Sequence, residues 1–278
     1  MSGVLSRRPR FALHGAHAIV TGGSSGIGFA TAAALAAKGC VVSLIARDQG
    51  RLDRAAARLR SDGAHVVVAS ADVSDRDAVF GAVDRLVAVG GPCDVLVASA
   101  GQARLGRFLE MEDEVYRRMV EVDYFGTLWP MRAVVPAMVE RRRGSVMAVS
   151  SAAGVVGIYG YSAYGPAKFA VRGLMESLRD ELAPHGVHAG CVFPPDVDTP
   201  QLADEERYKP PETAAISGAI KALDPTTVAA SIVTGIERGR ALVYPDRQTA
   251  ALARLAPLGR PIFNAVIDRK VRQAQRRR

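Results

Sequence analysis

Short apolar runs rich in β-branched residues alternate along the chain, from residue 16 onward, with longer amphipathic or alanine-rich stretches. The apolar runs predict seven strands, at 18–21, 41–46, 66–69, 95–98, 145–150, 187–192 and 241–244. The stretches between them predict helices at 27–37, 51–61, 76–89, 112–140, 163–183 and 226–238. This alternation is typical of a parallel sheet with right-handed crossovers. We therefore expect an α/β fold, a doubly wound parallel sheet in three layers, α/β/α.

The length of 278 residues suits a single domain of this kind. We place that domain at 14–245, with a basic N-terminal extension at 1–13 and a basic, partly apolar C-terminal tail at 246–278. Prolines concentrate in 194–224, which predicts an excursion over the carboxyl edge of the sheet. Such a segment would serve as a substrate lid, or as a plain surface connection.

The formal net charge of +8 lies at the ends of the chain. Residues 1–15 contribute +3 and residues 246–278 contribute +7, which leaves −2 for residues 16–245. A nearly neutral body argues against a nucleic-acid groove. The basic ends suit peripheral contact with an anionic membrane surface, binding of a phosphate-bearing ligand, or simple solubility.

Targeting and metal-binding signals are absent from the pattern. Glycines interrupt the uncharged stretch 15–37, and charged residues, prolines and a glycine interrupt 249–267, so we expect no transmembrane helix. No apolar segment precedes Gly15 as a secretory signal would require, and we expect a cytoplasmic location. Cys40, Cys93 and Cys191 are widely spaced in apolar runs, which predicts buried, reduced thiols. The five histidines show no metal-ligand spacing, and no metal site is expected.

The first predicted strand runs directly into a glycine-rich loop, TGGSSGIG at 21–28, which opens a helix. Glycines permit a tight turn and let the backbone approach a pyrophosphate, while a helix N-terminus offers unpaired N–H groups to that anion. In this context the loop predicts dinucleotide binding; helix packing alone is the alternative. The residues that we expect to contact the cofactor here are Gly22, Ser24, Ser25, Gly26, Ile27 and Gly28.

The residue after the second predicted strand, Arg47, indicates which dinucleotide is bound. An acidic side chain at this place would accept hydrogen bonds from the ribose 2′-hydroxyl of NAD, whereas a guanidinium suits the 2′-phosphate of NADP. Arg47 therefore predicts NADP(H), and the neighbouring Asp48 leaves NAD as the alternative. Arg51, one helical turn further, would add to the same phosphate pocket or be an ordinary solvated charge.

Tyr164 and Lys168 are four residues apart in YGPAK, on one helix face if Pro166 occupies the first turn. A nearby ammonium favours the phenolate, so we expect the Tyr164 pKa to fall from about 10 toward the working pH, as a general acid or base requires. Ser151, thirteen residues upstream at the end of a predicted strand, could hydrogen-bond the same substrate oxygen. A Tyr–Lys pair at this spacing also occurs by chance on surface helices.

Taken together, TGGSSGIG, Asp72-Val73, Ala100-Gly101, Ser151 and YGPAK resemble the short-chain dehydrogenase/reductase family over about residues 14–245. The resemblance implies a single-domain Rossmann-type fold. It also implies that Tyr164 exchanges a proton with the substrate, that Lys168 lowers the Tyr164 pKa and holds the nicotinamide ribose, and that Ser151 orients the substrate oxygen. Further cofactor contacts implied by the resemblance are Arg47, Arg51, Asp72, Val73, Ala100, Gly101, Tyr164, Lys168, Val197 and Thr199.

Three further stretches are similar to the 3-ketodihydrosphingosine reductase branch of that family, namely YFGTLWP at 124–130, PPDVDTP at 194–200 and EERYKPPET at 205–213. This resemblance implies NADPH-dependent reduction of the 3-keto group of a long-chain amino ketone to give dihydrosphingosine, in sphingolipid synthesis. It also implies a homodimer or homotetramer formed through the two long helices. A basic, partly apolar tail agrees with a lipid substrate. The alternative is another apolar substrate, such as a steroid or a fatty-acyl carbonyl.

Two positions depart from the family pattern. Asp123 stands where the family usually has an Asn that helps to hold a water, and Ala98 replaces the Asn of Asn-x-Ala-Gly. A carboxylate accepts hydrogen bonds but cannot donate as an amide does, so we expect Asp123 to act in the catalytic site with an altered water geometry or pH profile. The alternatives are a solvated helix residue, or a non-catalytic NADPH-binding regulatory protein. The change at Ala98 is expected to affect sheet cross-links more than chemistry.

Two aromatic groups remain to be placed. Tyr124, Phe125 and Trp129 predict a core or subunit-interface cluster. The segment between Ser151 and Tyr164 carries Ile158, Tyr159 and Tyr161, which we expect to line a lipid-sized pocket.

Overall fold

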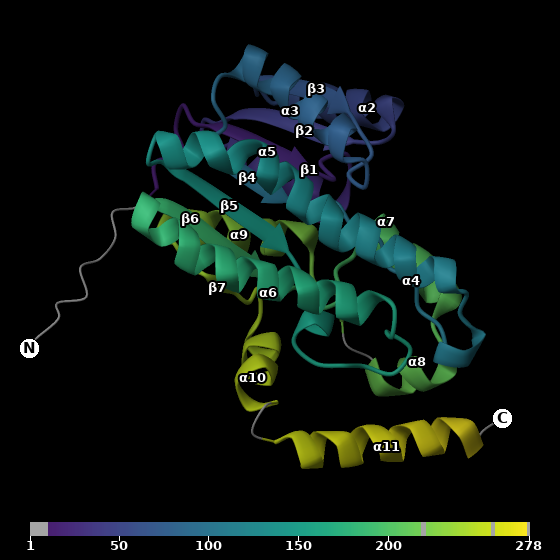
Figure 1. The fold of residues 1–278 in the computed structure, drawn as a ribbon. Coiled ribbons are helices and arrows are strands. Elements are labelled where there is room, and N and C mark those ends of the chain that lie inside the picture. Colours follow the sequence, from purple (N-terminus) through teal and green to yellow (C-terminus); the bar gives the residue numbers. More distant parts are fainter. Residues whose placement is uncertain (1–10, 218–220, 257–258, 277–278) are drawn as a thin grey trace, which may run out of the picture.

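The computed structural model describes residues 11–217, 221–256 and 259–276, and these residues form one seven-stranded parallel sheet (Figure 1). The strands are β1 (His17–Thr21), β2 (Val41–Ala46), β3 (Val66–Ser70), β4 (Val95–Ala98), β5 (Gly144–Val149), β6 (Val187–Val192) and β7 (Leu242–Val243). Their order is β3-β2-β1-β4-β5-β6-β7, so the winding reverses between β1 and β4. The predicted doubly wound parallel sheet is confirmed. Residues 1–10 of the N-terminal extension lie outside the described residues.

Helices cover both faces of the sheet (Figure 1). One face packs against α3 (Arg76–Gly90), α5 (Gly126–Glu140) and α6 (Tyr164–Leu182). The other packs against α1 (Gly26–Ala36), α2 (Gln49–Ser61) and α9 (Pro225–Arg238). The three-layer arrangement explains why β1, β4, β5 and β6 are buried along their whole length, since a parallel sheet with both faces covered buries every side chain.

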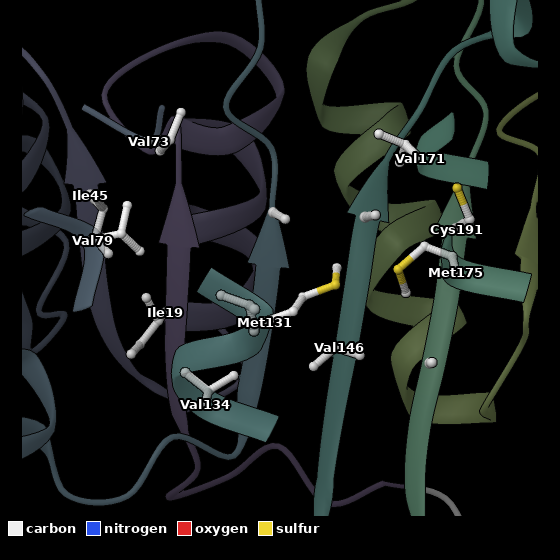
Figure 2. Close-up of a cluster of buried hydrophobic side chains, with 14 of the residues drawn as sticks. Ile19, Ile45, Val73, Val79, Met131, Val134, Val146, Val171, Met175 and Cys191 are labelled. Carbon is white, nitrogen blue, oxygen red and sulfur yellow. The ribbon is translucent and has the colours of Figure 1, made fainter. Parts of the chain in front are cut away.

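The largest of the three hydrophobic side-chain clusters within the described residues fills the space between the sheet and α3, α5 and α6. Figure 2 shows Ile19 and Val146 on the strands, with Met131 and Val134 from α5 and Met175 from α6. Burying an aliphatic side chain of this size contributes about 1.5–3 kcal/mol. The packing makes the sheet a rigid platform, and the loops at its carboxyl edge are therefore held in place at their roots.

The predicted helix at 112–140 is interrupted. It consists of α4 (Asp113–Met119), a π-helical segment η2 (Val120–Phe125) and α5. A π turn adds one residue to the helical repeat, so the side chains that follow are rotated relative to those of an unbroken α-helix. Gly126, at the start of α5, lies so close to Val73 that a Cβ there would come within 2.6 Å of the Val73 Cγ2 atom. Asp123 lies inside the π-helical segment.

The proline-rich segment 194–224 and the tail contain helices that the apolar pattern does not predict. The segment folds into α7 (Pro200–Glu205), a 3₁₀ turn η5 (Glu206–Tyr208) and α8 (Pro211–Ser217). The tail forms α10 (Arg247–Leu255) and α11 (Arg260–Arg276). Helix α11 lies along α8 (Figure 1), and Lys270 Nζ on α11 donates to the Ile216 carbonyl on α8 at 3.0 Å. Shorter 3₁₀ turns are η1 (Phe108–Glu110), η3 (Ala152–Gly154) and η4 (Ala183–His185). No helix within the described residues is long and apolar enough to cross a membrane.

Candidate active site

A cavity of ≈ 880 Å³ lies at the carboxyl edge of the sheet, and its walls come from the segments that follow β1 to β6. In doubly wound sheets, ligands bind at this edge where the strand order reverses. Of the predicted site residues, those that line the cavity are Gly22, Ser24, Ser25, Gly26, Ile27, Gly28, Arg47, Arg51, Asp72, Val73, Ala100, Gly101, Ser151, Tyr164, Lys168, Val197 and Thr199. The remaining one, Asp123, lies directly behind the wall.

The glycine loop crosses from β1 to α1 with almost no room for side chains. Gly22 has φ +67°, and a Cβ there would lie 2.8 Å from the Ala100 Cα atom. A Cβ at Gly28 would come closer still to the Gly22 carbonyl oxygen. Ser25 precedes α1 in an extended conformation, and within the described residues its side chain makes no capping hydrogen bond. The first N–H groups of α1 are therefore available to an anion in the cavity, as the predicted pyrophosphate site requires.

The end of β2 presents cations rather than a free acid. Asp48 caps α2, because its Oδ1 atom accepts the Arg51 backbone N–H at 2.9 Å and its Oδ2 atom lies 3.6 Å from Arg51 Nε. Arg47 exposes 62% of its side chain and reaches only to 4.0 Å from Asp72 Oδ2. The guanidinium of Arg47 is thus free to meet a phosphate, while the carboxylate of Asp48 is occupied.

Asp72 is held in place beside the cavity as an anion. Its Oδ1 atom accepts hydrogen bonds from the Ser74 backbone N–H at 3.0 Å and from the Ser74 hydroxyl at 2.7 Å, and Arg118 lies 3.2 Å from its Oδ2 atom. Burial acts to raise the Asp72 pKa, but the hydrogen bonds from Ser74 and Arg118 outweigh it, and the pKa is lowered.

The segment after β4 is tied to β1. The backbone N–H groups of Ser99 and Ala100 both donate to the Thr21 hydroxyl at 3.1 Å. This contact cross-links the two central strands at the position where the usual Asn is replaced by Ala98.

Tyr164, Lys168 and Ser151 converge on the cavity as predicted. Tyr164 opens α6, and Lys168 follows one turn later on the same face, with its Nζ atom 5.5 Å from the centre of the Tyr164 ring. Both side chains are buried. Ser151 follows β5, accepts the Ala153 backbone N–H at 3.1 Å and hydrogen-bonds Tyr164. The Tyr164 phenol and the Ser151 hydroxyl could together hold one oxygen of a ligand, with Lys168 beside them.

The predicted lowering of the Tyr164 pKa by Lys168 is wrong for this structure. Burial raises the Tyr164 pKa well above 10, and the charges of Asp123 and Glu205 raise it further, against a smaller effect of the Ser151 hydrogen bond. The ammonium of Lys168 does not reverse this because its charge is already paired with Asp123. Tyr164 therefore holds its proton firmly.

Asp123 lies beneath the cavity floor and is fully buried, so the alternative of a solvated helix residue is wrong. Its Oδ1 atom lies 3.1 Å from Lys168 Nζ and accepts the Gln102 backbone N–H at 3.2 Å. Its Oδ2 atom is buried and has no hydrogen-bond partner among the described residues. Burial raises the Asp123 pKa, while Lys168 acts in the opposite direction. Lys168 also donates to the Val149 carbonyl at 3.2 Å, which fixes the ion pair against β5.

Residues between Pro194 and Tyr208 form one wall of the cavity, and they include a residue that sequence reasoning missed. Glu205 ends α7, exposes only 9% of its surface and lines the cavity. The segment is anchored by a 3.0 Å ion pair between Arg107 and Glu212 and by Arg104, whose guanidinium stacks 3.0 Å from the centre of the Tyr208 ring. Glu205 stands in a run of charged residues, and nothing in that pattern distinguishes a buried acid from its exposed neighbours.

Ile158, Tyr159 and Tyr161 were expected to line a pocket, and only Tyr161 does so. Tyr161 lines the cavity, but Ile158 packs into the hydrophobic clusters, and the Tyr159 carbonyl accepts the Thr213 hydroxyl at 2.8 Å. Phe125 stacks on Trp129 with the ring centres 5.2 Å apart, outside the cavity.

The cysteines and histidines lie away from the cavity. The three cysteines are buried and free, as predicted. Within the described residues no group of His, Cys, Asp and Glu side chains could hold a metal ion.

Comparisons with known proteins agree with this geometry. A family model described as short chain dehydrogenase matches residues 16–209. The chain is similar to a 3-dehydrosphinganine reductase from Danio rerio, with 40% identity over 86% of this chain and 73% of the relative. It is also similar to a 3-ketodihydrosphingosine reductase from Dictyostelium discoideum, with 36% identity over 95% of this chain and 85% of the relative.

Solved structures show the same fold. A short chain dehydrogenase/reductase from Burkholderia phymatum in complex with NAD superposes with a TM-score of 0.81 at 25% identity, over 91% of this chain and 96% of the other. An actinorhodin polyketide ketoreductase with NADPH gives a TM-score of 0.75 at 28% identity, over 82% of this chain and 95% of the other.

Proposed function

We propose, because this chain belongs to the short-chain dehydrogenase family, that it reduces a lipophilic ketone to a secondary alcohol with NADPH. The substrate we propose is 3-ketodihydrosphingosine, a long-chain amino ketone that becomes dihydrosphingosine. Relatives named for this reaction support the proposal, since they are 36–40% identical to this chain over 73–85% of their own length.

The choice of NADPH rests on the end of β2. A guanidinium at Arg47 matches a 2′-phosphate, whereas the carboxylate of Asp48 is engaged in capping α2 and is unsuited to accept a ribose hydroxyl. The glycine loop and the N-terminus of α1 would hold the pyrophosphate. The cofactor, when bound, supplies a hydride to the carbonyl carbon.

The proton comes from Tyr164. Its high pKa keeps the phenol protonated, so it can donate a hydrogen bond to the substrate carbonyl and transfer the proton as negative charge develops on that oxygen. Lys168, 5.5 Å from the ring centre, stabilises the phenolate that forms. Ser151 hydrogen-bonds the substrate oxygen that receives the proton. The described part of the segment, from Pro194 to Tyr208, acts as a lid that excludes water from this end of the cavity.

The observation that carries the proposal is the meeting of Tyr164, Lys168 and Ser151 with the glycine loop and Arg47 on one cavity. The test is oxidation of NADPH by the purified protein with 3-ketodihydrosphingosine in mixed micelles, with a Tyr164→Phe variant and NADH as controls. Turnover that requires both Tyr164 and NADPH would establish the reaction. NADPH binding without turnover would reject this substrate in favour of another apolar ketone, and failure across a panel of such ketones would favour a non-catalytic NADPH-binding protein.

The basic tail supplies a second expectation, that the protein is cytoplasmic and touches an anionic membrane surface. Arg269 and Arg272 are exposed on α11, so replacing both by Glu should reduce binding to phosphatidylserine vesicles at low salt. Equal vesicle binding by the variant would reject the contact.

Assembly is the remaining expectation. A homodimer or homotetramer through α5 and α6 agrees with Phe169, which leaves 38% of its surface exposed on α6. A monomeric mass in solution would reject it.

A further inference from the structure

The proposed substrate carries a protonated amine on the carbon next to its carbonyl. When Tyr164 contacts the carbonyl oxygen, that amine must lie at the same end of the cavity, within a few ångströms of the phenol. A group that recognises it would be an acceptor, preferably charged, in a wall that faces both Tyr164 and the lid.

The acids on the cavity wall differ in whether they are free for this role. Asp48 and Asp72 lie toward the β2 and β3 end of the cavity and are occupied by Arg51, Ser74 and Arg118. Asp204 exposes 57% of its side chain and pairs with Arg207 at 3.4 Å. Asp196, on the loop after β6, also lines the cavity but is only partly buried. Glu205 differs from all four because it is buried, at the lid end of the cavity.

Glu205 is fixed in position but lacks a counter-charge. Its Oε1 atom accepts the Gln201 side-chain N–H at 2.8 Å, which ties the carboxylate to the previous turn of α7. Among the described residues no Lys, Arg or His nitrogen lies within ion-pair distance of it. The two nearby lysines are already engaged, Lys209 with Glu206 at 2.7 Å and Lys168 with Asp123 at 3.1 Å.

This environment makes the charged form of Glu205 costly in the absence of a cation. Burial raises the Glu205 pKa to about 7, the negative charge of Asp196 adds to this, and the hydrogen bond from Gln201 and the charges of Lys209 and Lys168 act against it. The titratable groups that face Glu205 come from the lid, the loop after β6 and the start of α6, and they are Glu206, Lys209, Asp196, Tyr161, Tyr164 and Lys168. An ammonium placed against the carboxylate would supply the missing charge.

The carboxylate also lies within electrostatic reach of the proton donor. Its charge contributes to the raised pKa values of both Tyr164 and Tyr161, and all three side chains line the same cavity. The carbonyl site and Glu205 are therefore neighbouring parts of one pocket.

We propose that Glu205 is a specificity residue that binds the protonated amine of the substrate while Tyr164 contacts the adjacent carbonyl oxygen. The inference rests on the proposed function and deepens it. A neutral ketone, such as a steroid, would leave the buried carboxylate uncompensated, so Glu205 selects amino ketones over neutral ketones of equal chain length.

The test compares two ketones on three proteins. The ketones are 3-ketodihydrosphingosine and 1-hydroxyoctadecan-3-one, which has the same chain without the amine. The proteins are the wild type, Glu205→Gln and the matched control Glu206→Gln, whose carboxylate is 56% exposed and pairs with Lys209. Glu205→Gln should lower kcat/KM for the amino ketone by about tenfold or more, through KM, because a charge-assisted hydrogen bond becomes a neutral one. The neutral ketone should change by less than about twofold, and the control should retain the wild-type ratio.

Several outcomes would overturn the inference. It fails if Glu205→Gln keeps the wild-type ratio of the two ketones, or if Glu206→Gln loses it equally. NADPH binding by each variant shows that the protein has folded, and Glu205→Asp, which keeps the charge, should retain most of the preference. If the wild type reduces neither ketone, the proposed function is wrong; the amine site is then judged by binding of dodecylamine against dodecanol, and equal binding of the two overturns it as well.

Discussion

Replacing Asp123 by Asn tests the electrostatics of the site with the least change in shape. The amide keeps an oxygen to accept the Gln102 N–H and places a donor where the Oδ2 atom now has no partner. It removes one buried negative charge next to Lys168. The Lys168 ammonium, no longer compensated, should then favour the phenolate form of Tyr164.

The size of the effect follows from two distances. The Asp123 Oδ1 atom lies 3.1 Å from Lys168 Nζ, and Nζ lies 5.5 Å from the centre of the Tyr164 ring, so carboxylate and ring are at most about 8.6 Å apart. At an effective dielectric constant of about 20, two like charges at that distance repel by about 2 kcal/mol. Since 1.36 kcal/mol corresponds to one pH unit, the phenolate should form more than about one pH unit lower in the variant.

The assay is oxidation of dihydrosphingosine by NADP⁺ as a function of pH, because this direction needs Tyr164 as a base. The pH of half-maximal kcat should fall by more than about one unit in Asp123→Asn, and the reduction rate should begin to decline at a correspondingly lower pH. Glu121→Gln is the matched control, since Glu121 belongs to the same π-helical segment but is half-exposed and lies 3.8 Å from Arg118. Its profile should match the wild type.

An unchanged profile in Asp123→Asn would refute the reasoning. It would mean that Asp123 is already protonated at the pH of the assay, so that the ion pair with Lys168 carries no charge to remove. Burial raises the Asp123 pKa and Lys168 opposes it, and the experiment shows which of the two prevails.

Three other predictions follow from the same geometry. Arg47→Asp should weaken NADPH binding by about tenfold or more and NADH binding far less, measured as Kd; equal losses would show that Arg47 does not contact the 2′-phosphate. Gly101→Ala places a Cβ 2.7 Å from Asp123 Oδ1, so it should abolish most turnover and lower the free energy of unfolding, measured by thermal denaturation, by about 1–3 kcal/mol. Gly173→Ala is the control, because a Cβ there meets no atom within 4 Å, and it should change neither quantity. The KM for the amino ketone should rise as the pH falls through about 7, because protonation of Glu205 removes the charge that binds the amine; a KM independent of pH between 6 and 8 contradicts this.

The fold was predictable because its elements alternate and because the parallel sheet is buried on both faces. All seven strands and the helices that cross over between them lie within a residue or two of their predicted ranges. The π-helical segment was not predictable, since residues 120–125 contain no Gly or Pro that would mark a change in the helix. The helices α7, α8, α10 and α11 were missed because each is short or carries mixed charge, and packing stabilises them more than periodicity.

The site was predictable wherever a motif fixes both residue type and backbone shape. The glycine loop, Ser151, Tyr164 and Lys168 line one cavity, as expected. What could not be predicted is how charges pair across distant segments. Lys168 was expected to lower the Tyr164 pKa, but its charge is paired with Asp123 as well as lying near the Tyr164 ring. Glu205 lies in a run of charged residues whose burial depends on how the lid folds.

The two buried carboxylates together affect how Tyr164 serves as a proton donor. Asp123 and Glu205 approach Tyr164 from the floor and from the lid, and both charges raise its pKa, as burial does. A phenol surrounded in this way is a poor base at neutral pH, but it remains fully protonated over the range in which a carbonyl needs a proton donor. Binding of the substrate ammonium at Glu205 offsets one of the two negative charges only when the amino ketone is present. The bound amino ketone therefore makes loss of the Tyr164 proton easier at the moment when that proton is transferred, which favours reduction of this class of ketone over others.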